Sequence, residues 1–203
     1  MNRARTDHGA PPPQPVPTPV REATDRAAAA LAAFIAEPVT MTPQVIRRCP
    51  TLALPHLLGR PSLPVIGIYL GFSGDLDGHV VLLLRRRGAR YLAARLLGRG
   101  RDYRDPLARS ALGEIGNITV SSFLGLLADR QRLAVRPTPP TVVEDTAGAI
   151  LDGIVADLAG QVEEAPVIEV TITCGAVRTG GTLVILPRPS RAPEAAGILG
   201  GEG

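Results

Sequence analysis

The chain has 203 residues, 45% of them apolar, which suffices for the core of one domain or of two small, closely packed ones. Its net charge is +3, and we expect neither a signal peptide nor a membrane span, because residues 1–20 are polar and proline-rich and the uninterrupted apolar runs, such as Val80–Leu84, are short. Two cysteines, Cys49 and Cys174, match no metal-ligand spacing, so we expect a soluble cytoplasmic protein without a structural disulfide.

The two ends of the chain differ in composition from its middle. Residues 1–20 are polar and proline-rich, and residues 189–203 are similar in character. Such segments bury too little apolar surface to offset the entropy of ordering them, so both are predicted to be disordered tails. The segment 21–188 between them has the usual size of a single domain.

The first half of this domain is predicted to hold two helices separated by three strands. The first helix is alanine-rich and proline-free, and the second ends at Gly98, a residue typical of C-terminal caps. A turn-rich segment joins the two strands of a hairpin. In chain order we expect a helix over 22–37, a strand over 39–46, a helical or irregular link over 52–58, strands over 65–72 and 79–84, and a helix over 90–97.

The second half opens with the clearest helix start in the chain. Asp105 can accept hydrogen bonds from unpaired backbone amides, and Pro106 suits the first helical position, where its missing N–H costs nothing. This helix should run to about Asp129. After it we expect an extended, proline-interrupted edge strand over 133–143, a helix over 146–158 and hairpin strands over 167–173 and 182–186.

The order helix, strand, short helix, hairpin thus occurs twice. A shift of 92 residues places Glu22–Asp25 on Glu114–Asn117. A shift of 103 residues places Gly78–Leu83 on Gly181–Leu186. Because the matches follow a common order, they favour an internal duplication. We expect an α+β domain of duplicated helix–strand–hairpin units that share one mostly antiparallel sheet, with the helices segregated to one face. The repeats are predicted at about 21–98 and 105–188.

The helix that begins after Asp105 has an unusual polar stripe. At about 100° per residue, one acid, one amide and two hydroxyls fall on one side, without a long basic residue. Three glycines interrupt the helix and would let another surface approach its backbone. Periodicity alone favours an ordinary solvent-facing stripe, and a docking face is the alternative. The residues of the stripe are Ser110, Glu114, Asn117 and Ser121.

A longer pattern contains this stripe. Ser110, Glu114 and Asn117 follow one another at spacings of 4 and 3, and Pro140 stands 23 residues after Asn117. This pattern resembles the signature of the CheC/CheX/FliY family of chemotaxis phosphatases, which is Asp or Ser, then Glu, Asn and Pro at these spacings. The local sequence from Ser110 to Ile118 is also very similar to the family's helix. The resemblance includes the duplicated architecture and points most to the CheC-like proteins.

The resemblance implies a hydrolase that removes the aspartyl-phosphate of a CheY-like response regulator in chemotaxis or two-component signalling. Asn117 would hold the attacking water, and Glu114 would pair with a lysine of the regulator, with Ser110 and Pro140 as supporting positions. Phosphoryl transfer mainly requires such positioning and charge compensation. No cofactor or metal site of its own is expected, because the Mg²⁺ belongs to the regulator. The three histidines lie far apart in the sequence and are expected to be incidental.

Some family members have a second Glu–Asn pair on the first helix. Here the corresponding residues are Glu22 and Asp25, and Arg48 occupies the position of the proline. An aspartate would bring negative charge close to the phosphoryl oxygens, so we expect this second site to be degenerate. The alternative explanation is that the two acids, near the start of the helix, interact favourably with the positive end of its dipole.

Other functions compete with the phosphatase. Related flagellar switch proteins share the duplicated fold without the motif, which makes a non-catalytic binding module the main alternative. An association with the deamidase CheD could coexist with phosphatase activity. A cluster of arginines from Arg85 to Arg104 could bind phosphate or be a solvated helix face, and a nucleic-acid role ranks last. The intact Glu114–Asn117 pair favours the enzyme, and no membrane partner is expected.

Overall fold

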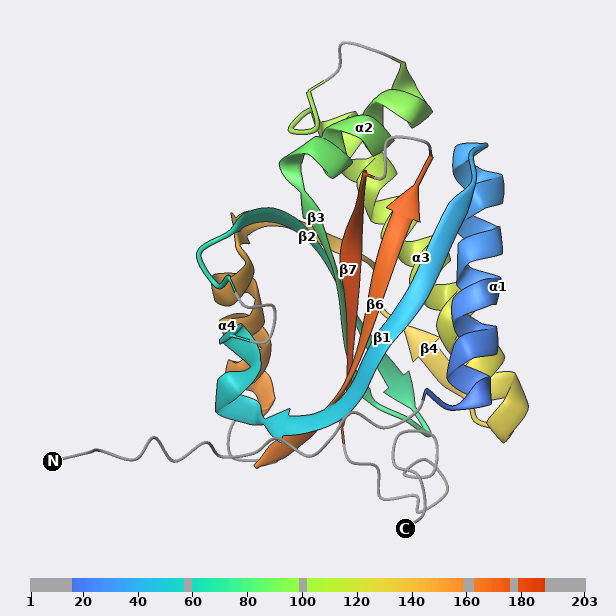
Figure 1. Cartoon of the computed structure of the whole chain (residues 1–203), viewed down its shortest axis with the longest axis vertical. Helices are drawn as coiled ribbons and strands as arrows, with labels where there is room; N and C mark the ends of the chain where they lie inside the picture. Colours follow the sequence, from blue (N-terminus) through green and yellow to red (C-terminus); the bar gives the residue numbers. More distant parts are fainter. Residues whose placement is uncertain (1–15, 57–59, 99–101, 159–162, 176–178, 189–203) are drawn as a thin grey trace, which may run out of the picture.

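The computed structural model describes residues 16–56, 60–98, 102–158, 163–175 and 179–188. Within these ranges the chain forms a curled antiparallel sheet with helices packed on it (Figure 1). The helices are α1 (Thr18–Ile35), the 3₁₀ helix η1 (Thr51–His56), α2 (Arg86–Leu97), α3 (Pro106–Gln131) and α4 (Ala147–Leu158). The strands are β1 (Val39–Pro50), β2 (Pro64–Gly74), β3 (Gly78–Arg85), β4 (Val135–Pro137), β5 (Thr141–Thr146), β6 (Glu164–Cys174) and β7 (Thr179–Pro187).

The sheet has the symmetry of a duplication. Its strand order is β1-β6-β7-β3-β2-β4, and β5 also pairs with β2. The two hairpins meet through β3 and β7, where Val81 lies opposite Val184, its equivalent under the shift of 103 residues. The outer strands are exchanged, because β1 pairs with β6 of the other repeat and β5 pairs with β2. The predicted duplicated units and their shared antiparallel sheet are therefore confirmed.

The core lies on both faces of the sheet. Along β3, Val80, Leu82 and Leu84 join the apolar cluster of α1, α2 and α3, whereas Val81 and Leu83 join the cluster of α4 and η1. The expectation that all helices lie on one face was wrong. A central strand whose two faces are both apolar must be covered on both sides, and α4 and η1 provide the second cover.

Several element boundaries differ from the predicted ones. α1 begins at Thr18 instead of Glu22, because Pro19 fits the first turn and the completely buried Val20 packs in the core. β1 continues to Pro50, and the extended segment 133–143 is divided into β4 and β5. The remaining parts of the two predicted tails, residues 1–15 and 189–203, lie outside the described residues.

α3 is the central helix of its layer. Asp105 caps it as predicted, with its carboxylate accepting a hydrogen bond of 2.8 Å from the Leu107 amide. Gly116 lets the helix approach β2 closely, since a Cβ at this position would lie 2.4 Å from Cγ2 of Ile68. Among the described helices, only α3 has the length and apolar content of a membrane span. Of its apolar 18-residue stretch, 56% is buried inside the domain. This burial is typical of a core helix.

The close contact at Gly116 predicts a stability difference between two glycine substitutions in one helix. Gly116→Ala should lower the free energy of unfolding by about 1–3 kcal/mol, because the new methyl group overlaps Ile68. Gly125→Ala, where a Cβ meets nothing within 4 Å, should instead raise it by up to about 1 kcal/mol. Urea denaturation of both variants and the wild type measures the difference, and equal effects would contradict the packing described.

Candidate functional site

The predicted motif residues of α3 lie together on its outer side. Ser110 and Glu114 are exposed, and Asn117 is partly buried. The Asn117 amide Nδ2 donates to Glu114 Oε2 at 3.4 Å, and the Ser121 hydroxyl donates to Asn117 Oδ1 at the same distance. Both hydrogen bonds are long and hence weak. The amide is therefore oriented from both ends, while the side chains keep capacity for further hydrogen bonds.

Pro140 reaches this face from the connection between β4 and β5. A Cβ added to Gly113 would lie 3.4 Å from the Pro140 Cγ and 3.7 Å from the Val142 Cγ2. The proline ring therefore lies against the helix backbone one residue before Glu114. Ser110 donates its hydroxyl to the carbonyl of Pro106 at 3.0 Å, within its own helix. The structure thus brings Pro140 to the same helix as the other three motif residues.

The pair predicted to form a degenerate second site, Glu22 and Asp25, lies on α1 and has a different environment. On α1, Glu22 Oε2 is 2.7 Å from the Arg130 guanidinium of α3, and Arg26 is 3.6 Å from Asp129. Arg130 is 16 residues from Glu114, which is about 24 Å along a helix axis. The Glu22 carboxylate thus has a cationic partner inside the domain, and this ion pair links α1 to α3.

Glu144 of β5 organises part of the arginine cluster. Arg104 donates to both carboxylate oxygens at 3.0 Å, and Arg86 and the Tyr103 hydroxyl each lie 3.0 Å from Oε1. The guanidinium carbons of Arg90 and Arg104 lie 5.9 and 5.4 Å from the centre of the Tyr103 ring. We refer to Glu144 and the side chains that contact it as the hub. Sequence analysis did not predict the hub, because Glu144 is 40 residues from its principal partner, Arg104.

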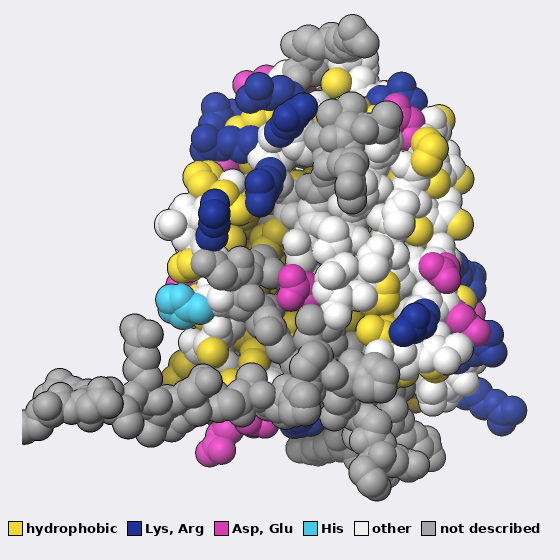
Figure 2. Space-filling view, in the orientation of Figure 1, with side chains coloured by type: hydrophobic (Ala, Val, Ile, Leu, Met, Phe, Trp, Pro, Cys, Tyr) yellow, Lys and Arg dark blue, Asp and Glu magenta, His cyan; other side chains and the backbone are white. Residues whose placement is uncertain are grey.

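These contacts change the acid–base properties of the hub. Hydrogen bonds from Arg104, and more weakly from Tyr103, lower the pKa of Glu144 to about 2. Burial, followed by the hydrogen bond to Glu144, raises the pKa of Tyr103. Figure 2 shows basic side chains gathered at the upper end of the molecule, where Figure 1 places α2. Part of the arginine cluster is therefore structural, while Arg99 and Arg101 lie outside the described residues.

The described ranges contain no group of three or more His, Cys, Asp or Glu side chains placed to hold a metal ion. His56 is exposed at the end of η1. His79 is buried, with its ring nitrogens 2.9 Å from the Tyr69 hydroxyl and 3.1 Å from the Asp157 carboxylate. His8 lies outside the described residues.

Comparison with known proteins extends this description. Residues 66–156, which include all four motif residues, match the family model described as chemotaxis phosphatase CheX. The chain is 31% identical over 125 residues to CheY-P phosphatase CheC of Bacillus subtilis (strain 168). This alignment covers 59% of each protein, so the chain spans about three fifths of the length of that relative.

Solved structures share the fold over most of the chain. FliY of Thermotoga maritima matches with a TM-score of 0.61 at 16% identity, over 86% of this chain and 87% of that one. The CheX–CheY–BeF3–Mg²⁺ complex of Borrelia burgdorferi matches with a TM-score of 0.54 at 14% identity, over 86% of this chain and 100% of the matched one. The chain therefore shares the α+β fold of these FliY and CheX structures. The chain is thus similar in sequence to the chemotaxis phosphatase CheX model over residues 66–156 and to CheC over 125 residues, and it shares its fold with FliY.

The lowered pKa of Glu144 predicts a pH dependence of stability. Its folded-state pKa of about 2 lies below the ordinary value of 4.5, so the carboxylate's contribution is fully present above pH 4.5. This contribution is lost as the pH falls through about 2. The difference in unfolding free energy between the wild type and Glu144→Gln should therefore shrink over this range. Urea denaturation at several pH values measures it.

Glu164→Gln is the matched control for this experiment. Its carboxylate forms a looser, exposed ion pair with Arg48 at 3.7 Å, so its removal should change stability little. A Glu144→Gln effect that is as small as the control's, or that does not vary between pH 4.5 and 2, would contradict the role of the hub.

Proposed function

We propose that this protein is a cytoplasmic phosphatase that hydrolyses the aspartyl-phosphate of a CheY-like response regulator in chemotaxis or two-component signalling. The observation that carries the proposal is the Glu114–Asn117 pair on the outer side of α3, with Pro140 packed beside it. The relative from Bacillus subtilis is named a CheY-P phosphatase, and the family model that spans the motif is that of a chemotaxis phosphatase.

Asn117 is suited to position the attacking water. Its Oδ1 can accept a hydrogen bond from water while its Nδ2 donates elsewhere, and it brings no charge towards the phosphoryl oxygens. The weak contacts with Glu114 and Ser121 favour one orientation of the amide before a partner binds. Such positioning matters because the hydrolysis needs an in-line water more than a covalent contribution from the enzyme.

Glu114 is suited to dock the partner. Its exposed carboxylate can form a charge-assisted hydrogen bond with a cationic side chain, such as a lysine, at the rim of the receiver's phosphorylation site. Mg²⁺ would come with the receiver domain, and the Borrelia complex contains CheX, CheY, BeF3 and Mg²⁺. In this proposal the chain itself supplies no cofactor. A CheD-type partner remains a prediction from the resemblance.

We place catalysis at α3 alone. Asp25 stands where a second site would need an asparagine, and Glu22 is held by Arg130. A carboxylate that already has a partner inside the domain would have to lose that ion pair before it could bind a receiver.

Asn117→Ala should abolish most of the phosphatase activity. Without the amide the water is no longer positioned, so kcat for dephosphorylation of a CheY-like receiver should fall by about 100-fold or more. Asp25→Ala is the matched control on α1 and should keep wild-type kcat. The assay measures loss of acyl phosphate from purified phosphorylated receivers. If the wild-type protein accelerates dephosphorylation of none of the organism's receivers, the binding-module alternative replaces the enzyme.

Glu114→Ala should act on binding more than on chemistry. Loss of the carboxylate removes the expected ion pair with the receiver, so KM should rise about tenfold or more. Titration of a beryllofluoride-activated receiver with the wild type, Glu114→Ala and Glu22→Ala measures the affinities separately from turnover. Glu22→Ala should bind like the wild type, and a loss of affinity in this variant equal to that in Glu114→Ala would contradict the single docking site.

A further inference from the structure

The polar stripe of α3 continues towards the start of the helix with an apolar side chain. Leu107 stands 3 residues before Ser110 and 7 before Glu114, and these offsets place it on the same side of the helix. Its side chain is 51% exposed and lies about 10 Å from Glu114 along the helix axis. The other large apolar side chains that are exposed in the described ranges, Phe34 and Leu52, lie on α1 and η1. Leu107 is therefore the one that shares a helix face with the motif.

The position of Leu107 matters more than its exposure. Single exposed leucines are ordinary on protein surfaces. A standard protein interface, however, buries about 800 Å² on each partner, with apolar side chains at its centre and polar ones at its rim. One carboxylate and one amide do not supply such a centre. A face that docks a partner through Glu114 and Asn117 needs apolar surface close to them, and Leu107 provides it.

The hub lies at the same end of α3 and adds positive charge. Arg104 directly precedes the capping residue of α3, Arg86 begins α2, and Glu144 lies 3.0 Å from both guanidinium groups. The side chains of Arg104 and Arg86 are still 58% and 50% exposed, so donors remain for a second carboxylate. The described ranges 85–98 and 102–105 contain six arginines and two aspartates, so the surroundings of the hub are also positive.

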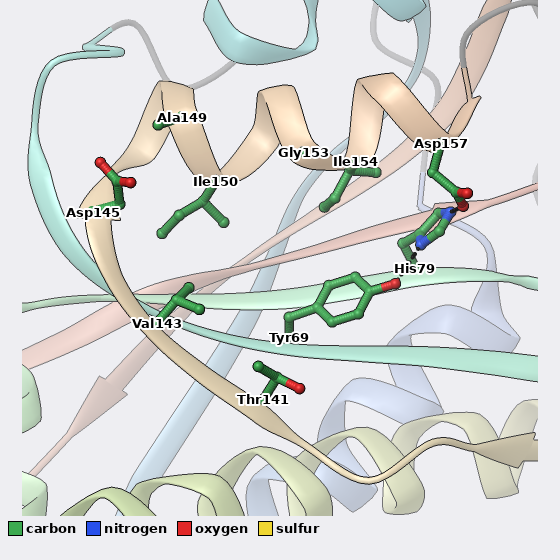
Figure 3. A pocket seen from close by; sticks show the side chains of 10 residues that line it. All are labelled: Tyr69, His79, Thr141, Val143, Asp145, Ala149, Ile150, Gly153, Ile154 and Asp157. Atoms are coloured by element: carbon green, nitrogen blue, oxygen red, sulfur yellow. Dashed lines mark hydrogen bonds and ion pairs between the residues drawn. The ribbon is translucent and has the colours of Figure 1, made fainter.

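Strand β5 places the hub beside the motif. Val142 contacts α3, and Glu144 binds the arginines of the hub. Thr141 and Val143 alternate with them and line a pocket on the opposite face of the sheet, beside α4 (Figure 3). Glu144 stands four residues after Pro140, which is at most about 14 Å of extended chain. A partner that covers the motif is therefore within reach of the hub.

We infer that the receiver-docking face of this protein extends from Glu114 and Asn117 to Leu107 and the arginines of the hub. This inference rests on the proposed function. The matching surface of the receiver has an apolar side chain that packs on Leu107 and carboxylates that pair with Arg86 and Arg104, beside its negatively charged phosphorylation site. Glu144 fixes the two guanidinium groups before binding, which lowers the entropy lost on association.

A matched pair of leucine variants tests the apolar part of this face. Leu107→Ser should raise the Kd of a beryllofluoride-activated receiver about fivefold or more, because a half-exposed leucine no longer contributes apolar surface to the complex. Leu52→Ser, at a leucine that is 78% exposed on η1, should bind like the wild type. Calorimetric titration measures the affinities, and thermal unfolding checks that both variants are folded. Unchanged affinity in Leu107→Ser, or equal loss in both variants, would overturn the inference.

A matched pair of arginine variants tests the charged part. Arg86→Gln should lower the association rate constant of the activated receiver about threefold at low salt, and the difference should disappear at about 0.5 M NaCl, where charges are screened. Arg48→Gln removes an arginine of similar exposure that pairs with Glu164 on the edge strand β1, and it should associate like the wild type. Stopped-flow fluorescence measures these rates. A loss in Arg86→Gln that does not depend on salt, or an equal loss in Arg48→Gln, contradicts a docking role of the hub.

The same titrations separate this inference from the proposed function. If the wild type hydrolyses the phosphorylated receiver but Leu107→Ser binds it unchanged, only the extended docking face is wrong. If the wild type binds the receiver without hydrolysing it, only the phosphatase is wrong, and the variants still test the docking face. If no receiver binds, both are wrong. Self-association of the wild type that Leu107→Ser abolishes, measured by light scattering, would assign Leu107 to a second copy of the chain and overturn the inference.

Discussion

The structure depends on the pairing of β3 with β7 at the centre of the sheet. Val81 lies opposite Val184, its equivalent in the other repeat, so the local symmetry of the sheet passes through this pair. Side chains on both faces of these strands are buried. Each repeat also lends its outer strand to the other, because β1 pairs with β6 and β5 with β2. Half of the chain would leave these strands unpaired, so the two repeats form one cooperative unit.

The central sheet in turn determines where α3 lies. The helix is capped at Asp105, contacts Ile68 at Gly116 and touches Pro140 at Gly113. Glu114 is next to one of these contacts, and Asn117 is next to another. The Glu114–Asn117 pair is thus placed on a rigid element between fixed points, which would reduce the ordering required on binding under the proposed function. The glycines that weaken the isolated helix are what permit two of these contacts.

Local signals in the sequence predicted much of this arrangement. The Asp105–Pro106 start, the repeat shifts and the motif spacing depend on nearby residues or on simple periodicity, and they located α3 and the duplicated sheet. Interactions between distant residues were not predictable in this way. Glu144 with Arg104, and His79 with Asp157, join segments that carry no shared pattern. The second helical layer was missed because a continuous apolar strand does not reveal how each of its faces is covered.

The two copies of the motif helix differ in the surroundings of their glutamates. Both copies keep a glutamate at the equivalent position, but Glu114 is exposed towards solvent whereas Glu22 pairs with Arg130. The charge of Asp25 alone would disfavour a phosphoryl group near α1, and the ion pair adds a separate reason, because docking there would break an interhelix contact. One copy therefore contributes an ion pair between α1 and α3, whereas the other keeps a polar face whose residues contribute little to the core.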